Sequence, residues 1–285
     1  MKSKGILDLI VFSEYRKTLL FLLQNNPMNL SKIKDVFGVT TPEIQPHLKK
    51  LEEAHIITKD NNNYILTPIG NLLADELNPA LDTIQTLDNN LEFFGGHDLS
   101  GIPSDLLNRI RELKDCTTVL DSKGNIIYDS HDIFKSHVLS ATRFIGFTSI
   151  FLPSWPATFL YLAQNNIQVE LIVTDDVFEE IQKHYSEQLE EGLQYENAHL
   201  YVCEHANIAF GITDKFFSLS LYRENGIYDS LNDLIGFDHA SIKWGEDLFE
   251  YYKGESVEIV SSQMNEYVTN ENVRNGVMNS IDGVD

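Results

Sequence analysis

The sequence predicts a two-domain α/β protein, in which a winged helix-turn-helix, mainly α with a β-wing, precedes a linker helix and a C-terminal α/β sheet. Three observations predict this. Residues 30–70 carry signals in the order helix, turn, helix, hairpin; residues 80–94 carry an apolar stripe at helical spacing; and strands alternate with helices from residue 97 onward. We expect residues 1–78 to form the winged domain, 79–96 the linker, 97–258 the α/β domain and 259–285 a tail.

The first helix of the helix-turn-helix is predicted over Leu30–Phe37. Gly38 ends it, because glycine adopts the positive φ of a tight turn without strain. The apolar positions of this helix recur three or four residues apart and predict one buried stripe, which consists of Leu30, Ile33, Val36 and Phe37.

The second helix carries the candidate base-contacting residues. Thr40 or Thr41 can cap it, and Pro42 stands in the first turn, where a missing N–H costs nothing. Its inward positions are Ile44, Leu48 and Leu51. The polar side chains of this segment are predicted to project into a major groove of double-stranded DNA: Thr40, Thr41, Glu43, Gln45, His47, Lys49 and Lys50.

A hairpin and two flanking helices complete the unit. Strands are predicted over 54–57 and 64–66, and the turn-forming tip between them places Lys59, Asn61 and Asn62 beside the phosphates. A preceding helix over Ile6–Leu23 carries Arg16 and Lys17 on its polar side, and a following helix runs from Thr67 to about Leu77. The alternative is a small helical core with no DNA-binding role.

Charge is distributed unevenly along the chain. The net charge of −22 would repel a polyanion, but residues 1–60 carry nine Lys or Arg against seven Asp or Glu. Residues 1–78 are neutral overall, so we expect modest, salt-sensitive DNA affinity from a homodimer that contacts two half-sites. The sequence shows no membrane span or signal peptide, which predicts a cytoplasmic protein, and Cys116 and Cys203 are expected to be reduced core residues.

The linker is predicted as a separate helix, Ala80–Phe94, which starts after Asn78-Pro79 and ends at Gly95-Gly96. Its apolar stripe could serve dimerisation or pack against the second domain, and the sequence leaves both open. The stripe consists of Leu81, Ile84, Leu87, Leu91 and Phe94.

The α/β domain is predicted from alternating segments. Strands are expected over 143–152, 169–174, 200–203, 207–213, 216–223 and 226–228, and helices over 157–164, 178–193 and about 241–252. Ligands favour the carboxyl ends of parallel strands. The residues at those ends suit a small polar or cationic effector; they are Thr148, Ser149, Phe151, Trp155, Thr174 and Asp175. Alternatively, Phe151 and Trp155 fill the core, and Asp175 with Asp176 caps the next helix.

Several segments together resemble a known family. They are His97-Asp-Leu-Ser-Gly-Ile-Pro103, residues 107–113, residues 213–222 and residues 243–252. They look like archaeal regulators that carry the Fil-type methanogenesis-regulator middle domain. The resemblance implies a transcriptional regulator of methanogenesis genes whose second domain senses a metabolite or mediates assembly.

The second domain also looks distantly like a phospholipase D-type half. That signature is His-x-Lys-x4-Asp, but here His205 is followed by Asn207 in the lysine position and by Asp214, displaced by two residues. We therefore expect no catalysis. The spacing of His131 to His137 and of His199 to His205 does not match a metal-binding helix face, so no metal site and no cofactor are expected.

Three hypotheses remain open. The chain is a ligand-responsive transcription factor, or a regulator whose acidic domain is a ligand-free protein-interaction platform, or an enzyme with a vestigial DNA-binding module. The first two share the DNA-binding unit, and only the third needs catalytic residues.

Overall fold

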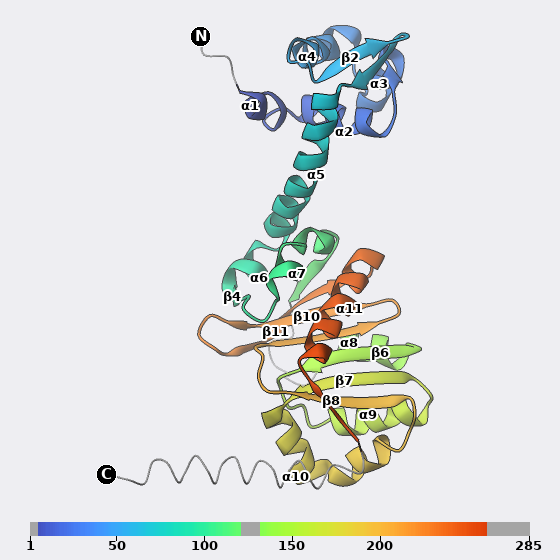
Figure 1. Cartoon of the computed structure of the whole chain (residues 1–285), viewed down its shortest axis with the longest axis vertical. Coiled ribbons are helices and arrows are strands. Elements are labelled where there is room, and N and C mark those ends of the chain that lie inside the picture. The colour runs from blue at the N-terminus through green and yellow to red at the C-terminus, as the bar shows by residue number, and fades with distance from the viewer. Residues whose placement is uncertain (1–4, 121–131, 261–285) are drawn as a thin grey trace, which may run out of the picture. The chain divides into compact units, whose positions relative to one another are not determined.

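The computed structural model describes residues 5–120 and 132–260, so His131 and all but the first two residues of the expected tail, 259–285, lie outside the described residues. The chain forms two compact units, Met1–Ile84 and Gln85–Asp285, which are coloured blue to teal and teal to red in Figure 1. Each unit has its own hydrophobic core. The mixed α/β class predicted from the sequence is confirmed.

The first unit contains the helices α1 (Ile6–Ile10), α2 (Glu14–Asn25), α3 (Leu30–Phe37) and α4 (Thr41–Glu53). The single helix predicted over residues 6–23 is wrong, because the helix is interrupted before Ser13 and a second helix begins after it. Ser13 is extended (φ −142°, ψ 105°) at the N-cap of α2, a position that serine favours.

The helix-turn-helix is confirmed. Gly38 follows α3 with φ +64°, and α4 begins after Thr40 with Pro42 in its first turn. Ile44, Leu48 and Leu51 are all buried. In α3 the predicted stripe is partly wrong: Ile33 is fully buried, but Val36 is 55% exposed.

A small antiparallel sheet in the order β1-β3-β2 forms the wing, from β1 (Met28–Asn29), β2 (Ile57–Asp60) and β3 (Asn63–Leu66). The predicted strand over 54–57 is wrong, since β2 begins only at Ile57. The tip is shorter than expected: it consists of Asn61 and Asn62, whose φ angles of 43° and 73° fit a two-residue hairpin turn.

The predicted break at Asn78-Pro79 is also wrong. One helix, α5 (Pro68–Asn89), runs through Pro79, and α6 (Leu91–Gly96) follows it. Pro79 lacks one backbone N–H, but the hydrogen-bond ladder continues on both sides of it. The helix ends where Asn90 is buried: its amide donates to the carbonyls of Thr86 and Cys116 (both 3.3 Å), and its Oδ1 accepts from the Thr118 N–H.

The second unit is built on one mixed sheet. Its strand order is β12-β8-β7-β6-β9-β10-β11-β5, and β4 (His97–Asp98) pairs with β10. The strands β6, β7 and β8 are parallel, and their neighbours on both sides are antiparallel. The bounds are β5 (Thr117–Leu120), β6 (Arg143–Thr148), β7 (Gln168–Thr174), β8 (Ala198–Cys203), β9 (Ile208–Thr213), β10 (Phe217–Arg223), β11 (Tyr228–Gly236) and β12 (Val257–Ile259). The strand predicted over 226–228 is wrong, because Gly226 (φ +78°) lies in the turn before β11.

Helices cover both faces of this sheet. On one face α11 (His239–Gly254) packs with α7 (Ser104–Leu107) and the 3-10 helix η1 (Ile110–Leu113), and the buried Trp244 Nε1 donates to the Leu106 carbonyl (3.0 Å). On the other face α9 (Trp155–Gln164) and α10 (Asp175–Gly192) pack against the parallel strands. A further helix, α8, spans Asp132–Leu139. Among the described residues, no helix is both long and apolar enough to cross a membrane.

Candidate nucleic-acid interface and effector cavities

The outward face of α4 carries the side chains that the sequence assigned to base and phosphate contacts. Gln45, Lys49 and Lys50 are exposed, and Thr41 and His47 are half-buried. Lys49 forms an ion pair of 3.7 Å with Glu53, but both side chains are more than 60% exposed. A pair this exposed contributes little to stability, so Lys49 can exchange Glu53 for a phosphate.

His47 joins this face to α2. Its Nδ1 lies 3.5 Å from the Arg16 guanidinium, and because arginine can only donate, Nδ1 is the acceptor and Nε2 carries the proton. Burial, followed by the positive charges of Arg16 and Lys50, lowers the pKa of His47. Arg16 also donates to the Leu9 carbonyl, while the neighbouring Lys17 pairs with Glu14 at 2.8 Å.

Thr40 and Glu43 are hydrogen-bonded to each other at the start of α4. The Glu43 carboxylate accepts from the Thr40 N–H and from its hydroxyl, both at 2.7 Å, which is one half of a capping box. These bonds lower the pKa of Glu43. Both residues are exposed, but their polar atoms already hold the helix end together.

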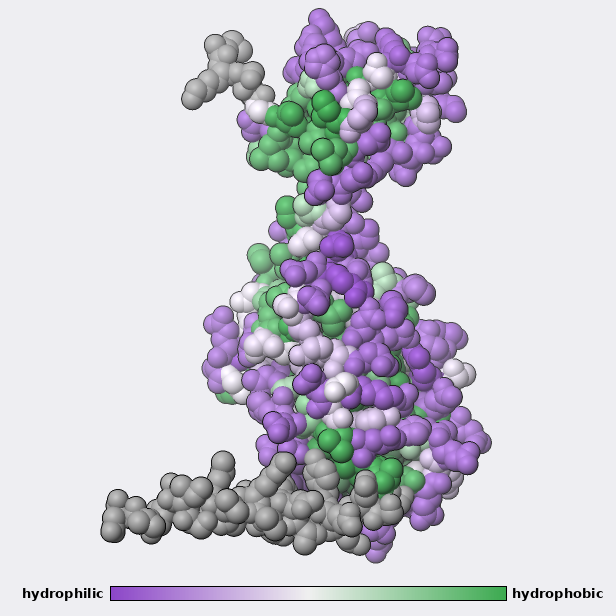
Figure 2. Space-filling view, in the orientation of Figure 1, coloured by the Kyte–Doolittle hydropathy of each residue, from purple (hydrophilic) through white to green (hydrophobic). Residues whose placement is uncertain are grey.

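The wing presents one cation and two amides. Lys59 Nζ lies 4.9 Å from the centre of the Tyr64 ring, and a hydrogen bond to Tyr64 raises the pKa of Lys59. Lys59, Asn61 and Asn62 are exposed. Figure 2 shows hydrophilic residues over most of the first unit and hydrophobic ones gathered on the side that carries α1, where Ile6, Leu7 and Phe12 are exposed.

The six candidate effector residues lie at the expected strand ends but do not share one cavity. Thr148 and Trp155 line a cavity of about 50 Å³, and Asp175 lines a larger one of about 840 Å³. The other three are engaged in packing and local hydrogen bonds. The Ser149 hydroxyl bonds the Ile208 carbonyl (2.8 Å) and Tyr222, Phe151 packs on Tyr185, and Thr174 is buried at the N-cap of α10.

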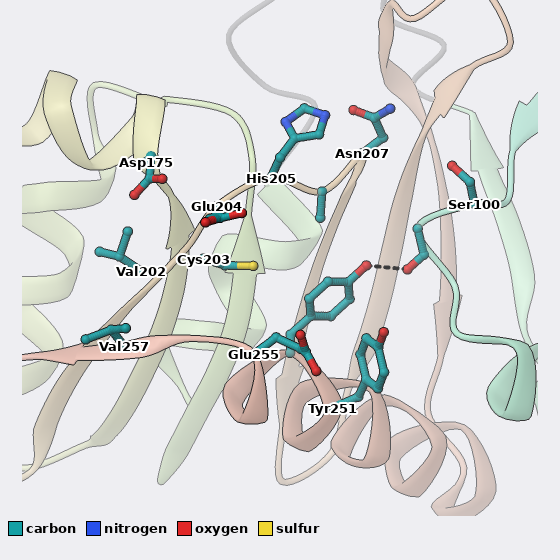
Figure 3. A pocket seen from close by; sticks show the side chains of 13 residues that line it. Ser100, Asp175, Val202, Cys203, Glu204, His205, Asn207, Tyr251, Glu255 and Val257 are labelled. Atoms are coloured by element: carbon teal, nitrogen blue, oxygen red, sulfur yellow. Dashed lines mark hydrogen bonds between the residues drawn. The ribbon is translucent and has the colours of Figure 1, made fainter. Parts of the chain in front are cut away.

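The larger cavity lies where β8 ends, between the start of α10 and the end of α11 (Figure 3). Carboxylates of Asp175, Glu204 and Glu255 line it, and the Tyr252 hydroxyl, which donates to the Gly101 carbonyl (2.5 Å), closes one side. Burial, with the nearby charges of Asp175 and Glu255, raises the pKa of Cys203. The thiol therefore stays protonated and is a poor nucleophile.

The residues of the degenerate phospholipase D-type signature do not converge. His205 and Asn207 line the larger cavity, whereas the Asp214 carboxylate accepts from the Thr142 N–H (3.3 Å) beside a different pocket. Within the described ranges, no three His, Cys, Asp or Glu side chains are grouped to hold a metal ion.

The smaller cavity contains polar residues that the sequence reasoning missed: Ser218, Ser220, Tyr228 and Asp233. A signal was present, because Phe217-Ser-Leu-Ser-Leu221 alternates serine with large apolar residues in a strand that has sheet neighbours on both sides.

Comparison with known families identifies both units. Residues 6–85 match the N-terminal domain of the methanogenesis regulatory protein FilR1, and residues 127–255 match its middle domain. By these two domains, the chain belongs to the FilR1 family. The FilR1 methanogenesis regulatory protein of Methanothrix harundinacea (strain 6Ac) is 23% identical over 252 residues, which are 87% of this chain and 56% of that protein. The chain thus spans just over half the length of this FilR1 relative.

Two solved structures show weaker similarity to this FilR1-family chain. TrmBL2, described as an archaeal chromatin protein with a novel mode of DNA binding, aligns with a TM-score of 0.42 and 12% identity, over 82% of this chain and 88% of that one. Phosphatidylserine synthase of Haemophilus influenzae Rd KW20 aligns with a TM-score of 0.39 and 12% identity, over 77% of this chain and 62% of that one. TM-scores of this size carry no information about what the FilR1-family chain binds.

Proposed function

We propose that this chain is a DNA-binding transcription regulator of methanogenesis-linked genes, in which α4 enters a major groove of double-stranded DNA. The observation that carries the proposal is the division of α4 into two faces. Ile44, Leu48 and Leu51 are buried in the core of the first unit, while Gln45, Lys49 and Lys50 face solvent. Membership of the FilR1 family supports a role in regulation rather than catalysis.

Neighbouring elements would contact the phosphates on either side of α4. Lys59 and the Asn61-Asn62 tip extend the same unit through the wing, and Arg16 and Lys17 lie on α2. These contacts are few, and the rest of the chain is strongly acidic, so the affinity should fall steeply with salt.

Replacing Gln45 with alanine is expected to relax base preference at one position of each half-site. Glutamine can bond adenine through its amide, and loss of such a contact costs about 1–3 kcal/mol of discrimination against other bases. Binding sites selected from random duplexes with the wild-type chain and with Gln45→Ala would measure this change.

The matched control is Gln85→Ala, which removes an exposed glutamine from α5. It should leave the selected sequences unchanged. If Gln45→Ala selected the same sequences as the wild type, this face of α4 would not be the base-contacting surface.

We further propose that two copies bind DNA as a homodimer through α5. Ile69, Leu72 and Ile84 are 49%, 61% and 53% exposed and recur on one side of this helix. Leu87 and Phe94 of the predicted stripe instead pack into the core of the second unit. A long helix with unpartnered apolar residues is suited to pairing with its own copy.

Introducing Leu72→Glu together with Ile84→Glu is expected to produce monomers and to weaken binding to a two-half-site duplex at least about tenfold, because avidity is lost. Analytical ultracentrifugation and fluorescence anisotropy would measure both effects. Asn71→Glu with Gln85→Glu adds the same charge to exposed polar positions of α5 and should change neither. A dimer that persists in the Leu72 and Ile84 variant would place the interface elsewhere.

The second unit is proposed to sense a small molecule that alters DNA binding. Its two cavities at the ends of the central strands support this role over that of a ligand-free interaction platform. Phosphodiesterase activity finds no support, because Asn207 and Asp214 do not reproduce the required cation and geometry.

A further inference from the structure

Strand β10 is buried on both faces, yet one of its faces is polar. Phe217, Leu219 and Leu221 point into the core beneath α11 and are fully buried. Ser218 and Ser220 alternate with them and are only 5% and 8% exposed. Strands buried on both sides ordinarily carry large apolar residues on both faces, so these two serines require a reason.

On the neighbouring strands the same face carries mostly small or polar residues. Residues paired across β6, β9, β10 and β11 share a face of the sheet, and two such rows lie beside each other. The first row is Thr148, Ala209, Ser220 and Asp233, and the second is Gly146, Gly211, Ser218 and Ile235. Of these residues, Thr148, Ala209, Ser218, Ser220 and Asp233 line the 50 Å³ cavity.

One hydroxyl in this cavity lacks a partner. Ser220 donates to the Asp233 carboxylate. Ser218 lines the cavity, and among the described residues its hydroxyl has no hydrogen-bond partner. This hydroxyl is therefore accessible to the cavity and can form a hydrogen bond with a ligand there.

The smaller cavity is lined by aromatic rings and by one negatively charged side chain. The rings of Phe144 and Trp155 stack with centroids 5.6 Å apart. Asp233 is the one charged side chain among the described lining residues, and no lysine, arginine or histidine accompanies it there. Burial, followed by the charge of Asp233, raises the pKa of Tyr228, so the phenol stays protonated beside that carboxylate.

These features exclude an anion and favour a small cation with an apolar body. An anionic ligand would face the Asp233 carboxylate with no cationic side chain among the described lining residues, whereas aromatic rings and a carboxylate together attract alkylated ammonium groups. Since one water needs about 10–15 Å³, the cavity holds about three to five non-hydrogen atoms.

We propose that this cavity is the effector site of the second unit and that its ligand is a small alkylammonium ion, which Asp233 and Ser218 bind at the polar end and Trp155 and Phe144 contact through its alkyl groups. The inference rests on the proposed sensing role and names the ligand class for it. In the larger cavity around Asp175, Glu204, His205 and Glu255 are exposed, so solvent screens their charges more than that of a side chain in the smaller cavity.

Calorimetric titration of the full chain with trimethylammonium chloride, without DNA, tests the site. We expect saturable binding by trimethylammonium and at least about tenfold weaker binding by tert-butanol, which is neutral and similar in shape, and by acetate, which is anionic and no larger than trimethylammonium. Equal binding of tert-butanol would show an apolar cavity without cation recognition, and absence of trimethylammonium binding would overturn the proposal.

Two variants locate the binding. Asp233→Asn keeps the shape and removes the charge, so trimethylammonium affinity should fall at least about tenfold. Ser218→Val fills the cavity and removes the unpaired hydroxyl, so binding should be lost while the melting temperature is kept or raised. A folded Ser218→Val protein that still binds trimethylammonium with wild-type affinity would place the ligand elsewhere. The matched control is Glu255→Gln, which removes a charge from the larger cavity and should leave trimethylammonium binding unchanged.

Adding DNA separates this inference from the proposed function. Wild-type chain that binds DNA but no alkylammonium ion would refute the site and leave the regulator intact. A chain that binds the alkylammonium ion but no duplex would refute the proposed DNA-binding function and leave the ligand site intact.

Discussion

Replacing Lys49 and Lys50 together with alanine is expected to weaken binding to all duplexes roughly 10- to 100-fold at moderate salt, with little change in sequence preference. Both lysines lie on the exposed face of α4, and neither belongs to the core of the first unit. Each phosphate contact releases condensed counterions, so loss of two contacts per protomer also flattens the dependence of log K on log salt by about one unit per lysine.

Fluorescence anisotropy between about 50 and 200 mM salt would measure both quantities. The control is Lys183→Ala with Lys215→Ala, which removes two exposed lysines from the second unit. It should leave affinity and slope within about twofold of wild type. Equal losses in the two double variants would mean that overall charge, rather than α4, governs the interaction.

Gly70→Ala is expected to unfold the first unit or to destabilise it by about 3 kcal/mol or more. A Cβ atom on Gly70 would lie 2.2 Å from the Ile56 carbonyl oxygen, which belongs to the backbone between α4 and β2. That oxygen also accepts from the Thr67 N–H (3.0 Å), so it cannot move without loss of the bond at the start of α5. For a unit of this size the melting temperature should fall by more than about 10 °C.

Gly95→Ala provides the opposite expectation. Gly95 is also helical, but beyond its chain neighbours and the helix's own backbone no atom lies within 4 Å of an added Cβ. Alanine should therefore stabilise α6 by about 0.5–1 kcal/mol. Urea unfolding followed by circular dichroism compares the two variants, and a Gly70→Ala protein as stable as Gly95→Ala would contradict the close approach of α5 to Ile56.

Local signals predicted the bounds of α3, its turn and the start of α4 accurately. Gly38, Thr40 and Pro42 each act within one helical turn of their own position, through a positive φ, a cap and a fixed φ. The buried positions of α4 followed from its 3.6-residue period alone. Information of this kind does not depend on distant parts of the chain.

Local sequence signals gave wrong element boundaries where they conflicted with hydrogen bonds formed in the folded chain. Pro79 predicted a helix end, yet α5 continues to Asn89 and ends where Asn90 bonds to Thr86, Cys116 and Thr118. Pairing of Lys59 with Tyr64 and of Asp60 with Asn63 extended the wing strands into a segment whose composition suggested a longer turn. At the end of α5 the bonds from Asn90 to Cys116 and Thr118 are long-range, whereas in the wing the pairing of two strands in a tight hairpin outweighed the turn propensity of single residues.

The candidate effector site shows the same limit. Thr148 and Trp155 were predicted because they lie at the carboxyl end of a buried strand, and the structure places them in one cavity. Their partners Ser218, Ser220 and Asp233 come from β10 and β11, about seventy residues later in the chain. Only the strand register brings these residues into rows beside Thr148.

The sequence by itself determined the helix-turn-helix, the outward polar face of α4 and the mixed α/β class of the second unit, because caps, glycines and periodicity act over a few residues. The tertiary structure alone decided where α5 ends, how short the wing tip is and which side chains surround each cavity. These features depend on pairing between strands and on buried hydrogen bonds from distant segments, whose free energy exists only once the chain has folded.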